Sequence, residues 1–387
     1  MLKYILQRIG FAILTLLIIV IVVFLLTAHF TENPFLKQAT DLSGNNNGSS
    51  QNTASKLRTL FEKSVDYHFL PLSWKGQYNE YKDQWLTYKL SPVIRFGYWL
   101  SDLFTNKEQP FGLPFDDKLF SQLGVTSIPH MFFKFLRFSV IITVPAFIIS
   151  AILGIFLGIL SGYKRGTWID ASINVFALFF IALPSFVIAP ILITILLSAN
   201  VAPNFILPDD SKYTTNQIIT SWIPPISIIV LGSLSGYITF TRNQVISVLT
   251  SNYVLIAKSK GLGTVEIFFK YVLRNISIPL AALLIPSYIG LLSGGIVIES
   301  YWRVPGTSQI IAQSFPNGEI NIIMFNTFFF TLLGVFTTIL VDVSYTFLDP
   351  RIKYSTKPSI FILVWKNQIL RNKEFQLLKH KGATNDI

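Results

Sequence analysis

Residues 138–160 read FSVIITVPAFIISAILGIFLGIL, an apolar run with no charged side chain. A helix rises about 1.5 Å per residue, so a run of this length covers the roughly 30 Å hydrocarbon core of a bilayer. A helix also pairs its backbone N–H and C=O groups internally, which lipid requires. The stretch therefore predicts a membrane-spanning helix, and it determines the fold class that we expect.

Other parts of the chain repeat this pattern. Five further stretches hold about 20 mostly apolar residues: 9–28, 169–197, 223–240, 278–298 and 322–347. Of the 387 residues, 51% are hydrophobic and 13% are charged, about half the charged share of a soluble domain. The first stretch is longer than the core of a secretory signal and lacks an Ala-x-Ala cleavage site. We expect an all-α membrane protein with six transmembrane helices.

The distribution of basic residues predicts the orientation. With the N-terminus in the cytoplasm, 17 of the 31 Lys and Arg residues lie in four inside segments, which are 1–8, 162–168, 242–277 and 349–387. The short outside loops 199–221 and 300–321 hold one basic residue each. By the positive-inside rule, the chain is a multi-pass protein of the cell membrane with both termini cytoplasmic. The net charge of +11 then reports topology, and nucleic acid is not an expected partner.

The spans divide the chain into four parts. Residues 1–30 form the N-terminal end and first helix, 31–137 an extracytoplasmic insertion, 138–348 the core of helices 2–6, and 349–387 a basic cytoplasmic tail. The insertion begins with a polar, low-complexity linker and is later rich in aromatic residues, with a possible amphipathic helix over 77–90. It is either a folded cap or a docking surface for an extracytoplasmic partner, and the two are compatible.

Small, kinking and acidic residues interrupt the spans. Ser150, Gly154, Gly158 and Gly162 recur every four residues and allow close approach of a second helix. Four prolines lie inside the expected spans: Pro145, Pro184, Pro190 and Pro286. Such prolines kink helices, which indicates either a transport pathway or helix packing. Asp170 and Glu299 lie near span ends. Asp342 lies within a span, and we interpret it as a structural acid paired with a base such as Arg351, although a carrier would also use such a residue.

Motifs for chemistry are missing from the sequence. The chain has no Cys and four scattered His, so a metal site is not expected. It has no phosphate-binding loop and no nucleophile elbow. We expect no catalytic residue and no cofactor on this chain. If it moves a solute uphill, the energy must come from a partner.

The segment between the fourth and fifth spans carries the most information. It predicts a helix, a break at residues 261–263, and a second amphipathic helix over 264–275 capped by Thr264. An apolar stripe of this second helix comprises Val265, Phe268, Phe269, Val272 and Leu273. Basic residues surround the stripe. Such a helix either lies on the inner leaflet or inserts into a groove of a partner protein.

This segment resembles the coupling loop, or EAA motif, of ABC importer membrane subunits, and more narrowly the B-type subunit of the oligopeptide/dipeptide permease family. The residues that carry the resemblance are Tyr253-Val254, Ala257, Lys260-Gly261-Leu262, Leu273-Arg274-Asn275 and Pro279. It continues through 294–299, 304–306, 341–342 and 349–351, and upstream through 1–8 and 158–170. Leu255 and Ile256 depart from the general motif, and residues 31–130 match poorly. The resemblance implies a type I ABC importer permease core.

The resemblance also implies partners and residue roles. The partners are a second homologous permease, two cytoplasmic ABC ATPase subunits that hold ATP and Mg²⁺, an extracytoplasmic peptide-binding protein and the lipid bilayer. The residues implied to couple to the ATPase are Tyr253, Ala257, Lys258, Lys260, Gly261, Leu262, Gly263, Glu266 and Arg274. Structural or helix-end roles fall to Gly154, Gly158, Asp342, Asp349, Pro350 and Arg351. The residues that line the substrate pathway are not indicated.

Three functions fit these observations. The first is the permease of an ATP-driven importer of oligopeptides. The second is a permease of the same family for a dipeptide, nickel, a glycan or another small solute. The third is a self-contained secondary carrier or channel, for which an inverted repeat or paired broken helices would be typical. Dependence on a separate ATPase separates the third from the first two.

Overall fold

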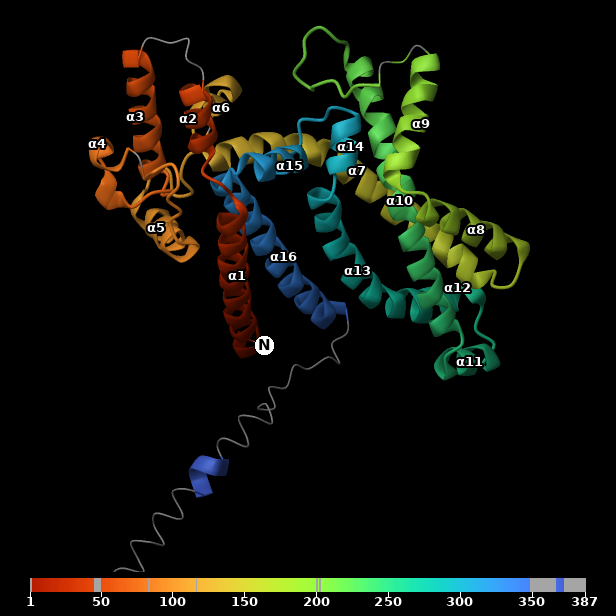
Figure 1. Cartoon of the computed structure of the whole chain (residues 1–387). Helices are drawn as coiled ribbons and strands as arrows, with labels where there is room; N and C mark the ends of the chain where they lie inside the picture. The colour runs from red at the N-terminus through yellow and green to blue at the C-terminus, as the bar shows by residue number, and fades with distance from the viewer. Residues whose placement is uncertain are drawn as a thin grey trace, which may run out of the picture.

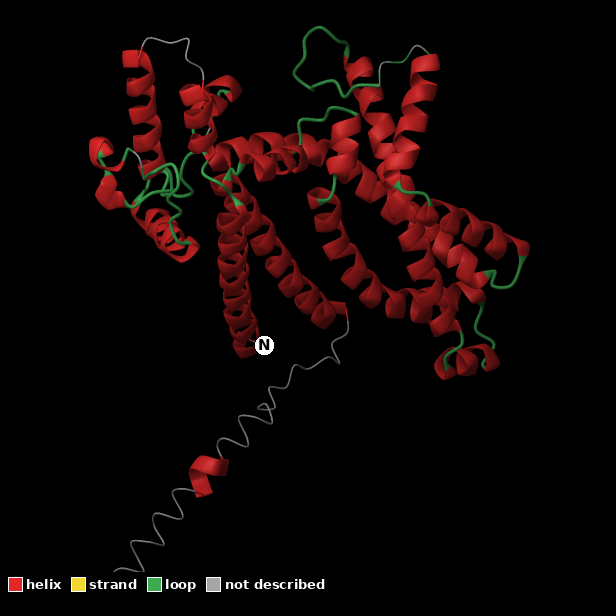
Figure 2. Cartoon of the chain, viewed as in Figure 1, coloured by secondary structure: helices red, strands yellow, loops and turns green. Residues whose placement is uncertain are grey.

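The computed structural model describes residues 2–44, 50–82, 84–115, 117–199, 201, 203–348 and 367–371. Within these ranges the regular structure is helical and contains no strand (Figure 2). Five helical stretches are long and apolar enough to cross a membrane, and a bent helix pair raises the number to as many as six. The long helices are α1 (Leu2–Phe30), α7 (Ile128–Tyr163), α10 (Thr215–Leu249), α13 (Arg274–Ser293) and α16 (Ile320–Leu348).

The third expected span is a broken helix. Over 169–197 the chain forms α8 (Trp168–Ala182) and α9 (Ser185–Ser198), which meet at 96°. Pro184 is the cause, because proline disfavours the helical conformation in the residue before it. Leu183 is accordingly extended, with φ −92° and ψ 109°. Pro184 therefore breaks a helix as the sequence indicated, whereas Pro145 and Pro190 lie inside continuous helices.

The ends of the helices sort to two sides of the molecule. Figure 1 places the N-terminal end of α1, the C-terminal end of α16 and helix α11 (Asn252–Ser259) at the lower side of the view. The insertion and the loop between α9 and α10 lie at the upper side. Helices α1 and α16 pack along each other. This alternation agrees with the succession of spans expected from the sequence.

Helices α2–α6 form the insertion between α1 and α7. They are α2 (Pro34–Gly44), α3 (Ser50–Asp66), α4 (Tyr78–Tyr81), α5 (Pro92–Thr105) and α6 (Asp117–Leu123), with a 3₁₀ turn at Leu72–Trp74. Aromatic side chains make a core here: Trp85 is 1% exposed, and its ring lies edge-on to Phe61 at 5.8 Å. The expected helix over 77–90 is wrong, since among the residues of this range that the structure describes only Tyr78–Tyr81 is helical. Trp85 lies in a turn and points into the core, whereas Tyr88 is exposed.

The insertion joins the spanning helices directly. Its core includes Phe24 of α1 and Met324 of α16. Glu319 accepts a hydrogen bond from the backbone N–H of Phe115 at 2.8 Å. Helix α7 begins at Ile128, ten residues before the expected start at 138, because Ser127 caps it by accepting from the N–H of His130. The expected boundary between insertion and core thus falls inside a continuous helix.

The glycine stripe of α7 is the tightest helix contact in the core. A Cβ on Gly154 would lie 2.5 Å from the Cβ of Tyr237, and one on Gly158 would lie 2.8 Å from the carbonyl oxygen of Ile238. Both partners belong to α10. The expectation that these glycines allow close approach of another backbone is confirmed.

Replacing Gly158 with alanine should lower the free energy of unfolding by about 1–3 kcal/mol, because backbone atoms of α10 would have to move. The matched control is Gly232→Ala in α10, where no atom lies within 4 Å of the added Cβ. We expect that control to change stability by about 1 kcal/mol or less. Thermal unfolding of the purified variants in detergent measures both. Equal melting temperatures for the two variants would contradict the packing argument.

Candidate functional site

The candidate site lies where the chain turns between α10 and α13. Residues 250–273, which we call the elbow, comprise α11, a turn at 260–263, α12 (Thr264–Ile267) and the π-helical segment η2 (Phe268–Leu273). Figure 1 shows α11 as the part of this end that projects furthest from the long helices. The elbow contains every coupling residue expected from the sequence except Arg274, which is the first residue of α13.

Gly261 allows the turn of the elbow. Its φ is +82°, a left-handed conformation that glycine adopts without steric cost. Its N–H donates to the carbonyl of Lys258 at 2.9 Å, and the N–H of Leu262 donates to Ala257 at 3.3 Å. These bonds satisfy carbonyls at the end of α11. The expected helix break is therefore confirmed.

The second half of the elbow differs from the expectation in two ways. Gly263 is the N-cap residue of α12, and Thr264 is the first helical residue and does not cap it. The helix also does not end at Asn275, because η2 leads directly into α13. Asn275 donates its side-chain amide to the carbonyl of Tyr271 at 2.6 Å inside the helix. The elbow is thus joined to α13 without a break in the helix.

The inner face of the elbow packs against the end of α10. Val245, Val254, Ile267 and Val272 are buried together in one cluster. Ala257, expected to allow close approach of an ATPase, is 3% exposed and belongs to the same cluster. Its small side chain therefore serves packing within the chain. Of the expected apolar stripe, Val272 is fully buried and Phe268 is partly buried.

The outer face of the elbow is apolar and exposed. We define the elbow surface by five of the exposed apolar side chains of the elbow, which are Tyr253, Leu255, Ile256, Val265 and Phe269; Leu273, at the end of η2, is 37% exposed. Val265 and Phe269 are 71% and 61% exposed, so the predicted stripe is divided between the two faces. The expected coupling residues Lys258, Lys260 and Glu266 are exposed beside this surface, as is Lys270. Glu266 forms an i, i+4 ion pair with Lys270.

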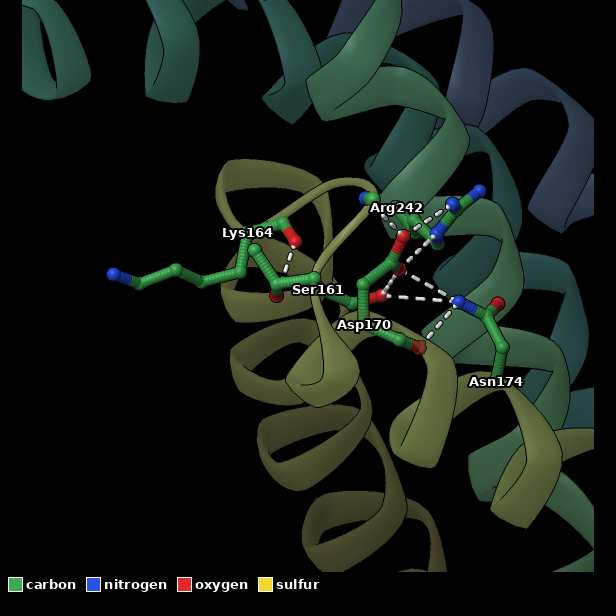
Figure 3. A network of polar contacts seen from close by, with 7 residues as sticks. Ser161, Lys164, Asp170, Asn174 and Arg242 are labelled. Carbon is green, nitrogen blue, oxygen red and sulfur yellow. Dashed lines mark hydrogen bonds and ion pairs between the residues drawn. The ribbon is translucent and has the colours of Figure 1, made fainter.

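A buried charge network holds α7, α8 and α10 together near the elbow (Figure 3). The carboxylate of Asp170 accepts from Arg242 Nε at 2.7 Å and Nη2 at 2.8 Å. Ser161 Oγ, Asn174 Nδ2 and the N–H of Gly166 also donate to it. Asp170 is 5% exposed. Its place in the first turn of α8 also favours a negative charge at the helix N-terminus.

This network was not predicted from the sequence. The sequence places Asp170 near a span end and Arg242 at the start of the loop, without indicating that they pair. One feature of the sequence could have indicated the pair. Asp170 and Arg242 each lie at the end of an apolar run, and both ends are expected on the cytoplasmic side. Pairing them needs the packing of α8 against α10, which involves residues 72 positions apart.

A second buried acid lies at the opposite end of the helices. Glu299 of α14 (Ile296–Tyr301) accepts from Ser139 Oγ of α7 at 2.7 Å and from the N–H of Gln309 at 3.1 Å. Gln309 belongs to α15 (Thr307–Asn317). Gly306 lies so close to the Glu299 carboxyl group that an added Cβ would collide with it. Glu299 therefore joins α7, α14 and α15. Glycine is required at position 306 because any side chain there would collide with the Glu299 carboxyl group.

The intramembrane acid Asp342 pairs with a basic residue of another helix. Its Oδ2 lies 3.1 Å from Arg8 Nε, which pairs α16 with α1. Arg351, the expected partner, lies outside the described residues, as do Asp349 and Pro350. The pair neutralises the acid between two packed helices.

Comparison with known proteins adds to this geometry. Residues 154–354 match the family described as "Binding-protein-dependent transport system inner membrane component". The oligopeptide transport system permease protein OppB of Mycoplasma genitalium is 27% identical over the whole of this chain and 85% of its own length. OppB of Mycoplasma pneumoniae is 32% identical over 49% of this chain and 48% of its own. The dipeptide transport system permease protein DppB of Bacillus subtilis is 29% identical over 55% of this chain and 66% of its own.

Proposed function

Because the chain belongs to the family of binding-protein-dependent transport system inner membrane components, we propose that it is the peptide permease subunit of an ATP-driven importer. The observation that carries this proposal is the elbow surface, an apolar patch on a projecting part of the chain whose inner face is packed against α10. The similarity to oligopeptide and dipeptide permeases supports a peptide as the solute.

The elbow surface is proposed as the docking site of a cytoplasmic ATPase. The five side chains of the elbow surface lie on α11, α12 and the start of η2, and they fit a groove on a partner protein in which such helices bury their apolar residues. The neighbouring Lys258 and Lys260 would lie at the rim of that contact. The alternative, contact with the inner leaflet, uses the same residues and is an outcome that the experiment below distinguishes.

The packing suggests how movement of the elbow would reach the membrane. The elbow shares a buried cluster with α10 and continues into α13. Arg242 joins α10 to α8 through Asp170, and the glycine stripe joins α10 to α7. A pull on α11 and α12 would therefore move α7, α8, α10 and α13 together. We propose that closure of two ATPase subunits on ATP and Mg²⁺ supplies this pull.

The remaining assignments follow from the same proposal. The bent pair α8–α9 is one of six spans, the elbow and both termini are cytoplasmic, and the insertion, which ends where α7 begins at Ile128, is extracytoplasmic. The core of α7–α16 pairs with a second homologous permease, and an external binding protein delivers the solute. Oligopeptides are favoured over dipeptides or another small solute, because two of the relatives named above are oligopeptide permeases.

Affinity purification of the tagged full chain from its native membrane tests the docking proposal. We expect an ATP-hydrolysing subunit and a second permease to be recovered with it, both identified by mass spectrometry. The double variant Val265→Ser/Phe269→Ser should lose the ATPase and keep the second permease. The matched control is Phe104→Ser, which changes a 78% exposed phenylalanine of the insertion and should keep both. Recovery of the chain alone, or an ATPase retained by the double variant, would contradict the proposal.

A further inference from the structure

A cavity in the insertion contains buried polar groups that the transport proposal does not use. Its volume is about 370 Å³, within the range of small-ligand sites. Helices α1, α3, α5 and α16 contribute to its wall, together with the turn before the 3₁₀ segment. The residues used below are Phe24, His68, Arg95, Trp99, Gln109 and Asn321.

Two of the unused groups are hydrogen-bond donors on one face of α5. Arg95 and Trp99, which are one helical turn apart, are each 5% exposed. Within the described part of the chain, Arg95 Nε and Trp99 Nε1 have no hydrogen-bond partner. A buried donor without a partner costs free energy, so the cavity favours a ligand that accepts from both.

The charge of Arg95 adds to this preference. Its Nη1 donates to the carbonyl of Ala28 at the end of α1, at 3.3 Å, and its guanidinium lies 4.1 Å above the ring of Phe69. Neither contact supplies a negative charge, and the described residues give Arg95 no ion pair. Burial lowers the pKa of Arg95 to about 10, so the guanidinium remains charged at neutral pH. The acids nearby are occupied, since Asp66 pairs with Lys75 and Asp102 with His68.

The other two unused groups accept hydrogen bonds. Nε2 of His68 lies 2.6 Å from Asp102 Oδ2, and in the tautomer that donates there Nδ1 is an acceptor. Gln109 donates Nε2 to the carbonyl of Thr126 at 3.1 Å, which leaves its Oε1. Neither His68 Nδ1 nor Gln109 Oε1 has a partner among the described residues. His68 reaches this position with a φ of +60°, a strained conformation that is typical of functional sites.

We propose that this cavity binds the C-terminal end of a short peptide. The carboxylate would accept from Arg95 and Trp99, a charge-assisted pairing. The peptide N–H groups would donate to His68 and Gln109, and Phe24 and Trp99 supply an apolar wall. The carboxylate preference rests on the cavity alone, whereas the identification of this ligand with the transported solute rests on the function proposed above.

The position of the cavity gives such a ligand contact with the spans. Phe24 belongs to α1 and Asn321 to α16, the two helices that pack along each other. Asn321 also donates to the carbonyl of Leu113 in the insertion at 2.8 Å. A bound peptide would thus touch the insertion and two spanning helices together.

Calorimetric titration of the full chain in nanodiscs, without partner proteins, tests the proposal. The probes are trialanine, trialanine amide and acetate. Trialanine should bind about tenfold or more tightly than its amide, because a charged hydrogen bond is lost. Acetate should bind more weakly than trialanine, because it has no peptide N–H. Equal binding of trialanine and its amide, or no binding of trialanine, would overturn the proposal.

Variants assign the binding to this cavity. Arg95→Met should weaken trialanine binding about tenfold or more. Trp99→Phe keeps the aromatic packing and removes only the N–H, so it should weaken binding a few-fold even if Arg95→Met disturbs the fold. Lys89→Met removes an exposed charge beside Arg95 and should have no effect. Unchanged binding in Trp99→Phe would contradict the site.

Failure here is separable from failure of the transport proposal. ATP-driven peptide uptake by a chain that binds free and amidated peptide equally would overturn this inference and leave the function standing. If the chain binds peptide through its carboxylate but is recovered without an ATPase, the binding site stands and the transport proposal is overturned.

Discussion

Replacing Gly261 with proline will reduce ATP-driven peptide uptake at least tenfold while leaving the chain in the membrane. Proline fixes φ near −65°, whereas Gly261 has a φ of +82°. The substitution also removes the N–H that donates to Lys258 at 2.9 Å. The turn between α11 and α12 then cannot form, and the elbow surface is no longer presented as one patch. Uptake of labelled peptide into vesicles that carry the complex measures the effect.

Gly263 provides the matched control. It lies two residues away with a φ of −69°, and an added Cβ meets no atom within 4 Å. Gly263→Ala should therefore transport as the unmodified chain does. Gly261→Ala should fall between the two, because alanine in the left-handed region costs about 1–2 kcal/mol. Normal uptake by Gly261→Pro would show that the conformation of the elbow is not needed for transport.

Replacing Asp170 with asparagine will destabilise the chain by about 3–5 kcal/mol, because it leaves Arg242 buried without its counter-charge. Arg242 donates twice to the carboxylate, and the two side chains are 22% and 7% exposed. Thermal unfolding in detergent measures the loss. The matched control is Asp209→Asn, which breaks an ion pair with Arg137. Because Asp209 is 71% exposed and Arg137 52% exposed, this variant should lower the free energy of unfolding by about 1 kcal/mol or less.

A double variant tests whether charge is the cause. Asp170→Asn/Arg242→Gln removes both charges, so it should unfold at a higher temperature than Asp170→Asn alone. Loss of packing alone would make the double variant the less stable of the two. That result would contradict an electrostatic role of the network.

The features predicted from the sequence were those encoded locally. Each span follows from a continuous apolar run, and the break at Gly261 and the bend at Pro184 follow from the backbone conformations of glycine and proline. The stripe of Gly154 and Gly158 follows from a four-residue period. These signals need no knowledge of which helices are neighbours.

The features that were missed depend on contacts between distant residues. The residues around Trp85 form turns and not the expected helix, because the aromatic core of the insertion determines their conformation. Asp170 finds Arg242 only after α8 packs on α10. Ala257 is buried because α11, α12 and the end of α10 pack into one cluster, and Arg8 meets Asp342 because α1 and α16 are adjacent. The cavity at Arg95 likewise joins segments from four parts of the chain.

These missed contacts are the ones through which we expect the elbow to act. The Asp170–Arg242 pair joins α8 to α10, to which the predicted glycine stripe also joins α7. At the opposite end, Glu299 ties α7 to α14 and α15. A displacement at the elbow would therefore reach the far side of the membrane through packed helices.

Uptake of labelled peptide into vesicles that contain the purified complex tests the central claim most directly. The binding protein and peptide are added outside, and ATP or a non-hydrolysable analogue is enclosed. We predict accumulation that requires hydrolysable ATP, persists when ionophores remove all ion gradients, and is lost in Gly261→Pro. Accumulation without ATP that stops when an ion gradient is removed would contradict the claim, and would point to the pair of Asp342 and Arg8 as the site of coupling.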